Sequence, residues 1–262
     1  MKKTSLNKKI LLLGAGGLVG RALFNNFESL GLDVRGTTRA DLDTCDTEIV
    51  KGFPWSDYDV IVDCTGFIDY GETKEIEEKL KKVNMEAPLN LLSQLGETQR
   101  YIYLSSHVVL LPPESQNPYA KSKAEFEKLS ASGEVKAKVL ILRLPGIFAD
   151  ERESGLLYKI KQSFLKRESL SLTINNVLWH AMYLPRVIEI IEKLITISPK
   201  ERIITVGYPT ETNIEKIIGD RKNVILNVNQ TDHYCPDVRI QNQYIQITPP
   251  MFEEDLEAYF KK

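Results

Sequence analysis

The sequence predicts an α/β fold, a doubly wound parallel sheet with a small C-terminal lobe. Short aliphatic runs alternate with helical stretches over residues 1–150, which is typical of a parallel sheet. Glycines interrupt the first of these runs where a strand would pass into a helix. Further along, the alternation gives way to helical stretches and one late strand-like run. We therefore expect a sheet domain over residues 1–150, a smaller lobe over residues 151–262, and a strand near residues 202–207 that returns to the sheet.

Composition limits the class of protein. With 262 residues and 42% hydrophobic composition, the chain can bury a core large enough for one domain and a dependent lobe. Lys and Arg number 34 and Asp and Glu 36, so the net charge of -2 offers no basic field to attract nucleic acid. The three cysteines lack the spacing of a metal or redox site, so we expect no metal and a reducing, cytoplasmic location. They are Cys45, Cys64 and Cys235.

The first apolar run resembles a secretory signal, because it follows Lys8 and Lys9. Four glycines between Gly14 and Gly20 break this run, however, and Arg21 follows at once. A strand, a turn and a helix would use each of these residues. No stretch approaches about 18 consecutive apolar residues, so we expect no transmembrane span and no membrane partner.

The glycine-rich turn predicts a dinucleotide-binding (Rossmann) domain. Gly14 would let the chain reverse, Gly17 would let backbone N–H groups approach a pyrophosphate, and Gly20 would let the following helix pack against the strand. Leu18 and Val19 are the first residues of that helix. The N-terminus of the helix, with its partial positive charge, would face the phosphates. Glycines at a spacing of three are weak evidence alone, but here they follow four aliphatic residues and precede a helical pattern.

The end of the second predicted strand, residues 33–37, indicates which dinucleotide binds. In dinucleotide folds an acid at this point holds the ribose hydroxyls. Here Thr38 and Arg39 stand instead, and a hydroxyl and a guanidinium suit a 2′-phosphate better than a bare ribose. The sequence thus favours NADP, with NAD as the alternative. Arg39 as a solvated loop arginine is the other interpretation.

The third predicted strand, residues 60–66, ends in small residues, as a backbone that passes closely under a cofactor requires. A charged helical stretch over residues 72–95 follows, with an interruption expected near Pro88. The other predicted elements are strands at 101–105, 139–144 and 202–206, a helix that begins at Tyr119, and helices at 156–165, 187–195, 212–218 and 249–260.

Tyr119 and Lys123 are four residues apart near a helix start, so their side chains share one face. A phenol with a pKa of about 10 needs a nearby ammonium to act in proton transfer at neutral pH, and Lys123 could supply it. A hydroxyl from a strand end, Ser106, could bind the same substrate oxygen. These three residues would move a proton to or from an alcohol oxygen. The alternative is an ordinary amphipathic helix start with a surface tyrosine.

Taken together, these features resemble the extended short-chain dehydrogenase/reductase family of nucleotide-sugar epimerases, dehydratases and reductases. The family's cofactor glycines match Gly14, Gly17 and Gly20. Its catalytic hydroxyl residue, tyrosine and lysine match Ser106, Tyr119 and Lys123. Its helix asparagine matches Asn84, and its strand-end segment matches Arg143–Phe148. The resemblance implies catalysis by Ser106, Tyr119 and Lys123. The cofactor contacts that it implies, together with the turn and strand ends, are Gly14, Gly17, Leu18, Val19, Thr38, Arg39, Asp43, Cys64, Thr65, Gly66, Asn84, Tyr119, Lys123 and Pro145.

Within the family, the segment Asp63–Asp69 and the charged helix after it are most similar to the dTDP-4-dehydrorhamnose reductase branch. In that branch Asp43 would contact adenine. His107 follows the catalytic hydroxyl where family dehydratases carry an acid, so a dehydratase is disfavoured. The substrate contacts that we expect are Ser106, His107, Phe148 and His180, although the two histidines could equally be structural.

The resemblance therefore implies NADP-dependent reduction of a keto group on a nucleotide-linked deoxysugar, with a nucleotide sugar as small-molecule substrate. One alternative is a nucleotide-sugar epimerase that retains NAD. Another is a non-catalytic NADP-binding regulatory or subunit protein, which the intact set of Ser106, Tyr119 and Lys123 argues against. A homodimer is one option for the assembly.

Overall fold

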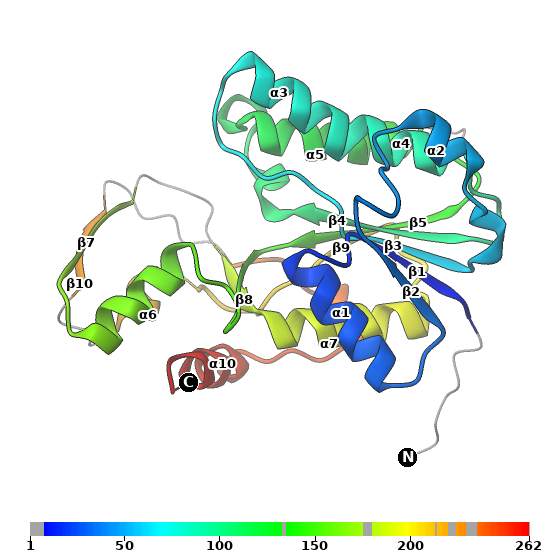
Figure 1. The fold of residues 1–262 in the computed structure, drawn as a ribbon. Coiled ribbons are helices and arrows are strands. Elements are labelled where there is room, and N and C mark those ends of the chain that lie inside the picture. Colours follow the sequence, from blue (N-terminus) through cyan, green and yellow to red (C-terminus); the bar gives the residue numbers. More distant parts are fainter. Residues whose placement is uncertain are drawn as a thin grey trace. The chain divides into compact units, whose positions relative to one another are not determined.

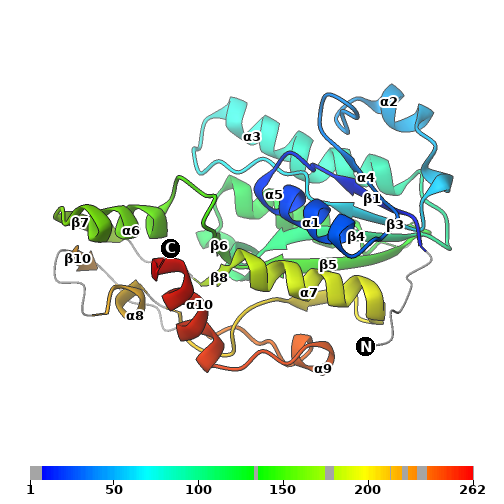
Figure 2. The ribbon, with the colours of Figure 1, turned by 60° about the horizontal axis from the view of Figure 1, so that its bottom comes forward.

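In the computed structural model, the described residues are 8–132, 135–174, 180–212, 214–219, 224–228 and 235–261. The chain divides into two compact units, drawn in Figures 1 and 2. The first unit comprises Met1–Arg143 and Ile191–Ile204, and the second comprises Leu144–Ile190 and Thr205–Lys262.

The first unit is built on a six-stranded sheet with the strand order β2-β1-β3-β4-β5-β9. β1 pairs in parallel with both β2 and β3, and β3 pairs in parallel with β4. The order therefore runs outward from β1 in both directions, which confirms the predicted doubly wound α/β fold. The strands are β1 Ile10–Leu13, β2 Val34–Thr37, β3 Val60–Asp63, β4 Arg100–Ser106, β5 Lys138–Leu144 and β9 Ile203–Thr205.

Helices cover both faces of this sheet. Figure 1 shows α2 to α5 on one face, and α1 with the Ile191–Ile197 part of α7 on the other. All four residues of β1 and all four of β3 are buried, as strands covered on both faces require. The helices are α1 Leu18–Ser29, α2 Thr47–Gly52, α3 Lys74–Lys81, α4 Ala87–Leu92, α5 Pro118–Leu129 and α7 Leu184–Ile197; short 3-10 turns cover Trp55–Asp57, His107–Leu110 and Pro113–Ser115.

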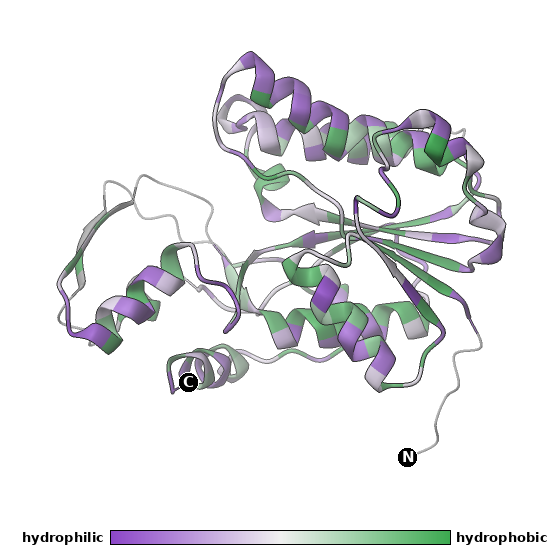
Figure 3. Cartoon of the chain, viewed as in Figure 1, coloured by the Kyte–Doolittle hydropathy of each residue, from purple (hydrophilic) through white to green (hydrophobic). Residues whose placement is uncertain are grey.

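The helical stretch predicted over residues 72–95 is interrupted just before Pro88. A π-helical turn, Lys82–Glu86, separates α3 from α4. Pro88 lacks an N–H and so cannot donate to the carbonyl of Asn84 four residues earlier. The hydroxyl of Tyr103 donates to that carbonyl instead, at 2.6 Å. The outer residues of α3 are hydrophilic (Figure 3), as expected of a solvated face.

The second unit contains two short parallel strand pairs, β6 with β8 and β7 with β10. Its core is aromatic, because the ring of Phe148 lies 5.3 Å from that of Tyr183 and 5.2 Å from that of Tyr259. The remaining elements are β6 Gly146–Phe148, β7 Leu170–Ile174, β8 Ala181–Tyr183, β10 Val224–Val228, α6 Leu156–Lys166, α8 Ile214–Ile218, α9 Gln241–Tyr244 and α10 Pro250–Lys261, besides the Leu184–Ile190 part of α7.

Candidate functional site

The glycine-rich turn between β1 and α1 has room for glycine alone at two positions. Gly14 adopts a φ of +75°, and a Cβ there would lie 2.9 Å from the carbonyl oxygen of Cys64. A Cβ on Gly20 would lie 2.2 Å from the carbonyl oxygen of Gly14, far inside van der Waals contact. Gly14 therefore packs directly against the residue that follows β3, and α1 packs directly against Gly14.

The start of α1 fits the pyrophosphate of a dinucleotide. Gly17 is the N-cap residue, no side chain caps the helix, and its first turn carries no acid. Leu18 and Val19 are the first two residues of the helix. Uncapped N–H groups at a helix N-terminus favour a bound anion, and the absence of a side chain on Gly17 allows a close approach.

Arg39 and Asp43, both expected to contact the cofactor, bind each other. Arg39 Nε lies 3.1 Å from Asp43 Oδ2, and the Arg39 side chain is 78% exposed. An exposed ion pair of this kind contributes at most about 1 kcal/mol, so a phosphate could displace it. The backbone N–H and hydroxyl of Thr38 donate to Asp41 Oδ2 at 2.8 and 2.7 Å. The Thr38 hydroxyl is thus already engaged at the end of β2.

A buried carboxylate organises the end of β3. Asp63 accepts hydrogen bonds from the backbone N–H and hydroxyl of Thr65, at 2.8 and 2.5 Å, and from the hydroxyl of Tyr101. Burial raises the pKa of Asp63, and these bonds oppose the shift. Burial also raises the pKa of the Cys64 thiol, which makes it unreactive. The Cys64–Gly66 segment is therefore held in place by side chains beneath it.

Asn84 acts on this segment through the backbone. Its amide accepts from the N–H of Phe67 and donates to the carbonyl of Phe67, both at 2.9 Å, and donates to the hydroxyl of Ser122 at 3.1 Å. The side chain is 1% exposed. Asn84, predicted to bind the cofactor, therefore fixes the loop after Gly66 to α5 in this structure.

Ser106 and Tyr119 lie together at the carboxyl end of β4. α5 begins where Asn117 Oδ1 accepts from the N–H of Ala120 at 2.8 Å, and Pro118 occupies the first turn, which places Tyr119 at the helix start. Burial raises the pKa of Tyr119 to about 12, and a hydrogen bond with Ser106 opposes this shift. Tyr119 is therefore a protonated phenol at neutral pH, ready to donate.

Lys123 is buried one turn further along α5. Its ammonium donates to the carbonyl of Leu104 at 3.0 Å and lies 4.3 Å from the centre of the Tyr103 ring. Burial lowers the pKa of Lys123 to about 8, against the raising influence of nearby acids. The spacing of Tyr119 and Lys123 predicted a lowered tyrosine pKa, whereas the structure gives a raised one, because burial outweighs the hydrogen bond from Ser106.

Tyr70 lies beside Tyr119 and was not among the residues expected from the sequence. Its ring meets that of Tyr119 edge-on at 6.0 Å between centroids, and 64% of the residue is exposed. Tyr70 directly follows the segment Asp63–Asp69, which carried the family resemblance. That position was the one feature of the sequence that could have indicated Tyr70. An exposed aromatic ring beside a buried phenol offers a surface for a flat or apolar ligand group.

The expected substrate residues fall in both units. His107 begins a 3-10 turn directly after Ser106 and is 3% exposed. Phe148 belongs to the second unit, where it is 2% exposed in the aromatic core, and so does Pro145, which was expected to contact the cofactor. His180 is 2% exposed, accepts from the N–H of Tyr208 at 3.3 Å and shares a 2.6 Å hydrogen bond with Thr212. Both ring nitrogens of His180 are thus engaged within the second unit, and its geometry is that of a structural histidine.

Two other features bear on possible ligands. The described residues contain no group of three or more His, Cys, Asp or Glu side chains that could hold a metal ion, and no described helix is long and apolar enough to cross a membrane.

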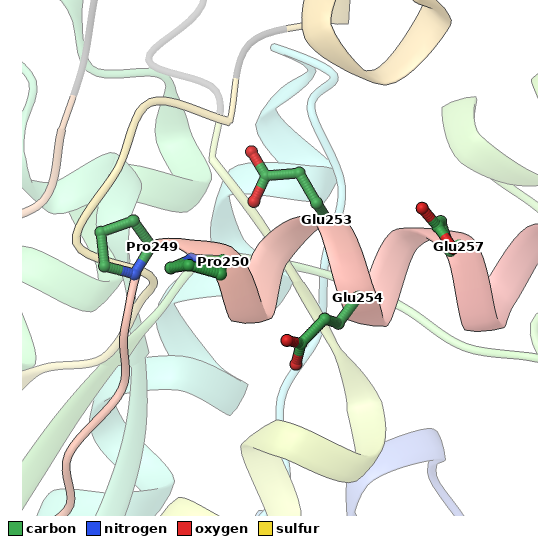
Figure 4. Close-up of a pocket in the computed structure, with 5 residues that line it drawn as sticks. All are labelled: Pro249, Pro250, Glu253, Glu254 and Glu257. Atoms are coloured by element: carbon green, nitrogen blue, oxygen red, sulfur yellow. The ribbon is translucent and has the colours of Figure 1, made fainter.

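Figure 4 shows an open pocket at the start of α10, lined by prolines and by three glutamates. It includes none of the predicted site residues, and its acids would repel a phosphate. Its lining is Pro249, Pro250, Glu253, Glu254 and Glu257.

Comparison with known proteins identifies a curated relative of part of this chain. A 113-residue segment is 26% identical to a dTDP-4-dehydrorhamnose reductase from Mycolicibacterium smegmatis, and it covers 43% of this chain and 34% of that protein. The chain thus spans about a third of the length of that curated relative.

Two solved structures share the fold over nearly the whole chain. One is a dTDP-4-dehydrorhamnose reductase from Bacillus anthracis in complex with NADP, with a TM-score of 0.76, 17% identity and coverage of 98% of this chain and 99% of that chain. The other is an ADP-L-glycero-D-manno-heptose-6-epimerase from Helicobacter pylori, with a TM-score of 0.74, 18% identity and coverage of 100% and 98%.

The family itself is identified by residues 8–177, which match the model of the RmlD substrate binding domain. That match covers more than half of the chain and includes the glycine-rich turn, Ser106, Tyr119 and Lys123. The resemblance predicted from these residues is therefore confirmed, and the chain belongs to the RmlD substrate binding domain family.

Proposed function

We propose that this chain catalyses the NADP-dependent reduction of a keto group on a nucleotide-linked deoxysugar, in the manner of a dTDP-4-dehydrorhamnose reductase. The observation that carries the proposal is the hydrogen-bonded pair of Ser106 and Tyr119 at the end of β4, with Lys123 one turn away. The curated relative and the Bacillus anthracis structure, both dTDP-4-dehydrorhamnose reductases, support the choice of reaction and cofactor.

NADP would be held along the carboxyl edge of the sheet. The uncapped start of α1 at Gly17 would take the pyrophosphate, and the small residues Cys64–Gly66 would lie under the cofactor. Arg39 would take the 2′-phosphate and release Asp43, which would then face the adenine. When bound, the reduced nicotinamide supplies hydride to the substrate carbonyl.

Ser106 and Tyr119 would bind the carbonyl oxygen of the substrate. Both hydroxyls can donate to an oxygen that gains negative charge during reduction, which stabilises the transition state. With a pKa of about 12, Tyr119 keeps its proton at neutral pH and passes it to the more basic alkoxide. The ammonium of Lys123 would then stabilise the phenolate of Tyr119. Because the pKa of Lys123 is about 8, the ammonium loses its proton as the pH rises above that value, and turnover would slow.

The proposal also covers the roles of the two units, the cellular location and the oligomeric state. The first unit would bind the dinucleotide, and the second would be the smaller substrate-binding lobe. We retain Pro145 as a candidate cofactor contact and Phe148 as a candidate substrate contact. A reducing, cytoplasmic location stays a prediction from the spacing of the three cysteines in the sequence. A homodimer stays a prediction, which sedimentation equilibrium tests.

The substrate class is tested with a panel of carbonyl compounds. Purified protein with NADPH is mixed with dTDP-4-dehydrorhamnose, with the same keto sugar lacking its nucleotide, and with a nucleotide sugar that has no keto group. We expect the first to give an alcohol two mass units heavier than the ketone, and the others to give no product. Equal turnover of the free keto sugar would contradict a nucleotide-sugar reductase.

Arg39→Ala is expected to weaken NADPH binding by about tenfold and to leave NADH binding within about twofold, because a charge-assisted hydrogen bond contributes roughly 1.5–3 kcal/mol. Calorimetric titration of both cofactors measures this change. Lys51→Ala, which removes another exposed basic side chain that pairs with an acid, is the matched control and should change neither affinity. Equal affinities of the wild type for the two cofactors, or a preference that Arg39→Ala leaves intact, would exclude Arg39 from the site.

A further inference from the structure

A buried cluster outside the proposed catalytic residues joins three elements of the first unit. The hydroxyl of Ser105, on β4, donates to Glu127 Oε1, on α5, at 2.6 Å. Arg143, on β5, donates through Nε to both carboxylate oxygens of Glu127, at 3.2 and 3.1 Å, and through Nη2 to Oε2 at 2.5 Å. Ser105 is 4% exposed and Glu127 is 7% exposed.

The position of this cluster relates it to the site. Ser105 directly precedes Ser106, and Glu127 lies one helical turn after Lys123 on α5. Arg143 belongs to the strand-end segment that the family resemblance singled out, and the proposed reaction gives the Arg143 side chain no role. A buried ion pair is weak evidence for stability, because its desolvation offsets much of the attraction, so a positioning role is the better explanation.

We propose that the Ser105–Glu127–Arg143 cluster is the positioning element of the site: it fixes the end of β4, with Ser106, against α5, and it holds a negative charge one turn from Lys123. This inference rests on the proposed function for its kinetic consequences. Its electrostatic consequence concerns Lys123 alone and can be measured without turnover.

The protonation of Lys123 depends on the charge of Glu127, because the buried ammonium is shielded from water and is influenced mainly by protein groups. The groups that face its ammonium are Asp63 and Cys64 at the end of β3, the Tyr103 ring on β4, and Glu127 on its own helix. Burial lowers the pKa of Lys123 to about 8, and the carboxylates of Asp63 and Glu127 raise it. Arg143 holds the Glu127 carboxylate in place through these contacts, and so the cluster keeps Lys123 charged to a higher pH.

The electrostatic part is tested with Glu127→Gln, which keeps the side-chain shape and removes the charge. NMR of ¹⁵N-labelled lysine follows the titration of Lys123, whose resonance is assigned with Lys123→Met. We expect its pKa to fall by about one pH unit. Glu125→Gln, at an exposed acid on the same helix, is the matched control and should leave the titration unchanged. A Lys123 pKa that is the same in Glu127→Gln as in the control would overturn the proposal.

The positional part is tested with Ser105→Ala, which leaves every charge in place. We expect kcat for NADPH oxidation to fall about fivefold, with the KM for NADPH within twofold and the Lys123 titration unchanged. This variant also decides the matter if Glu127→Gln does not fold, because wild-type kcat in Ser105→Ala would then overturn the proposal. Wild-type protein that reduces no keto sugar would refute the proposed function instead, while the lysine titration would still test the cluster.

Discussion

Tyr119→Phe is expected to lower kcat by at least about 100-fold and to leave NADPH affinity within about threefold. The aromatic ring can still fill its buried position, but no hydroxyl remains to protonate the developing alkoxide or to bond with Ser106. General acid catalysis typically contributes about 10²–10⁴-fold, which sets the size of the loss. Steady-state rates of NADPH oxidation measure kcat, and fluorescence titration of NADPH measures the affinity.

Tyr70→Phe is the matched control for this change. Like Tyr119→Phe, it removes one phenolic hydroxyl, here from the Tyr70 ring that meets the Tyr119 ring edge-on. The Tyr70 hydroxyl has no part in the proposed proton transfer. We expect its kcat to stay within about threefold of wild type. If Tyr119→Phe kept more than about a tenth of the wild-type rate, Tyr119 would not be the proton donor. If Tyr70→Phe were the slower variant, the donor would be Tyr70.

Gly20→Ala is expected to destabilise the first unit by about 3 kcal/mol and to abolish measurable NADPH binding. Its new Cβ would lie 2.2 Å from the carbonyl oxygen and 2.8 Å from the carbonyl carbon of Gly14, which are backbone atoms that no side-chain rotation can move. Relief requires α1 to move away from β1, which deforms the turn that Gly17 and Leu18 form. Forced overpacking of this kind typically costs about 1–3 kcal/mol.

Chemical denaturation and NADPH titration measure the two effects. Gly52→Ala is the control, because a Cβ on Gly52 would meet no atom within 4 Å and its backbone has no positive φ. We expect the control to stay within about 1 kcal/mol of wild type and to bind NADPH normally. Wild-type stability and NADPH affinity in Gly20→Ala would contradict the turn geometry described here.

Local patterns in the sequence predicted much of the first unit. The aliphatic run Ile10–Leu13 and the glycines after it located β1 and the start of α1, because few backbones place glycine at such spacing between a buried run and a helical pattern. Tyr119 was placed at a helix start because Asn117 and Pro118 form a recognisable N-terminal cap.

Features that depend on distant partners were not predicted. The strands β6 and β8 are three residues each, too short for a periodic pattern, and are stabilised by pairing with each other. The ion pair of Glu127 with Arg143 joins residues sixteen apart that no local spacing relates. Burial, which sets the pKa of Tyr119 and Lys123, likewise depends on the assembled fold.

The proposed reductase and the alternative nucleotide-sugar epimerase share the fold, the cofactor site and the catalytic tyrosine. They differ in the fate of the hydride. A reductase releases its oxidised cofactor each cycle, whereas an epimerase that retains NAD returns the hydride to the sugar. Thr38 and Arg39, in place of an acid that would hold the ribose, favour exchange and hence net reduction.

The most direct test is the fate of deuterium from NADPH labelled at C4 of the nicotinamide, on the face from which hydride is transferred, when it is mixed with the purified protein and dTDP-4-dehydrorhamnose. The proposed reductase predicts that each NADPH oxidised yields one alcohol product carrying one deuterium on the former carbonyl carbon. Protein that is isolated with bound NAD and interconverts two nucleotide sugars, with no net oxidation of NADPH and no deuterium in the product, would contradict it.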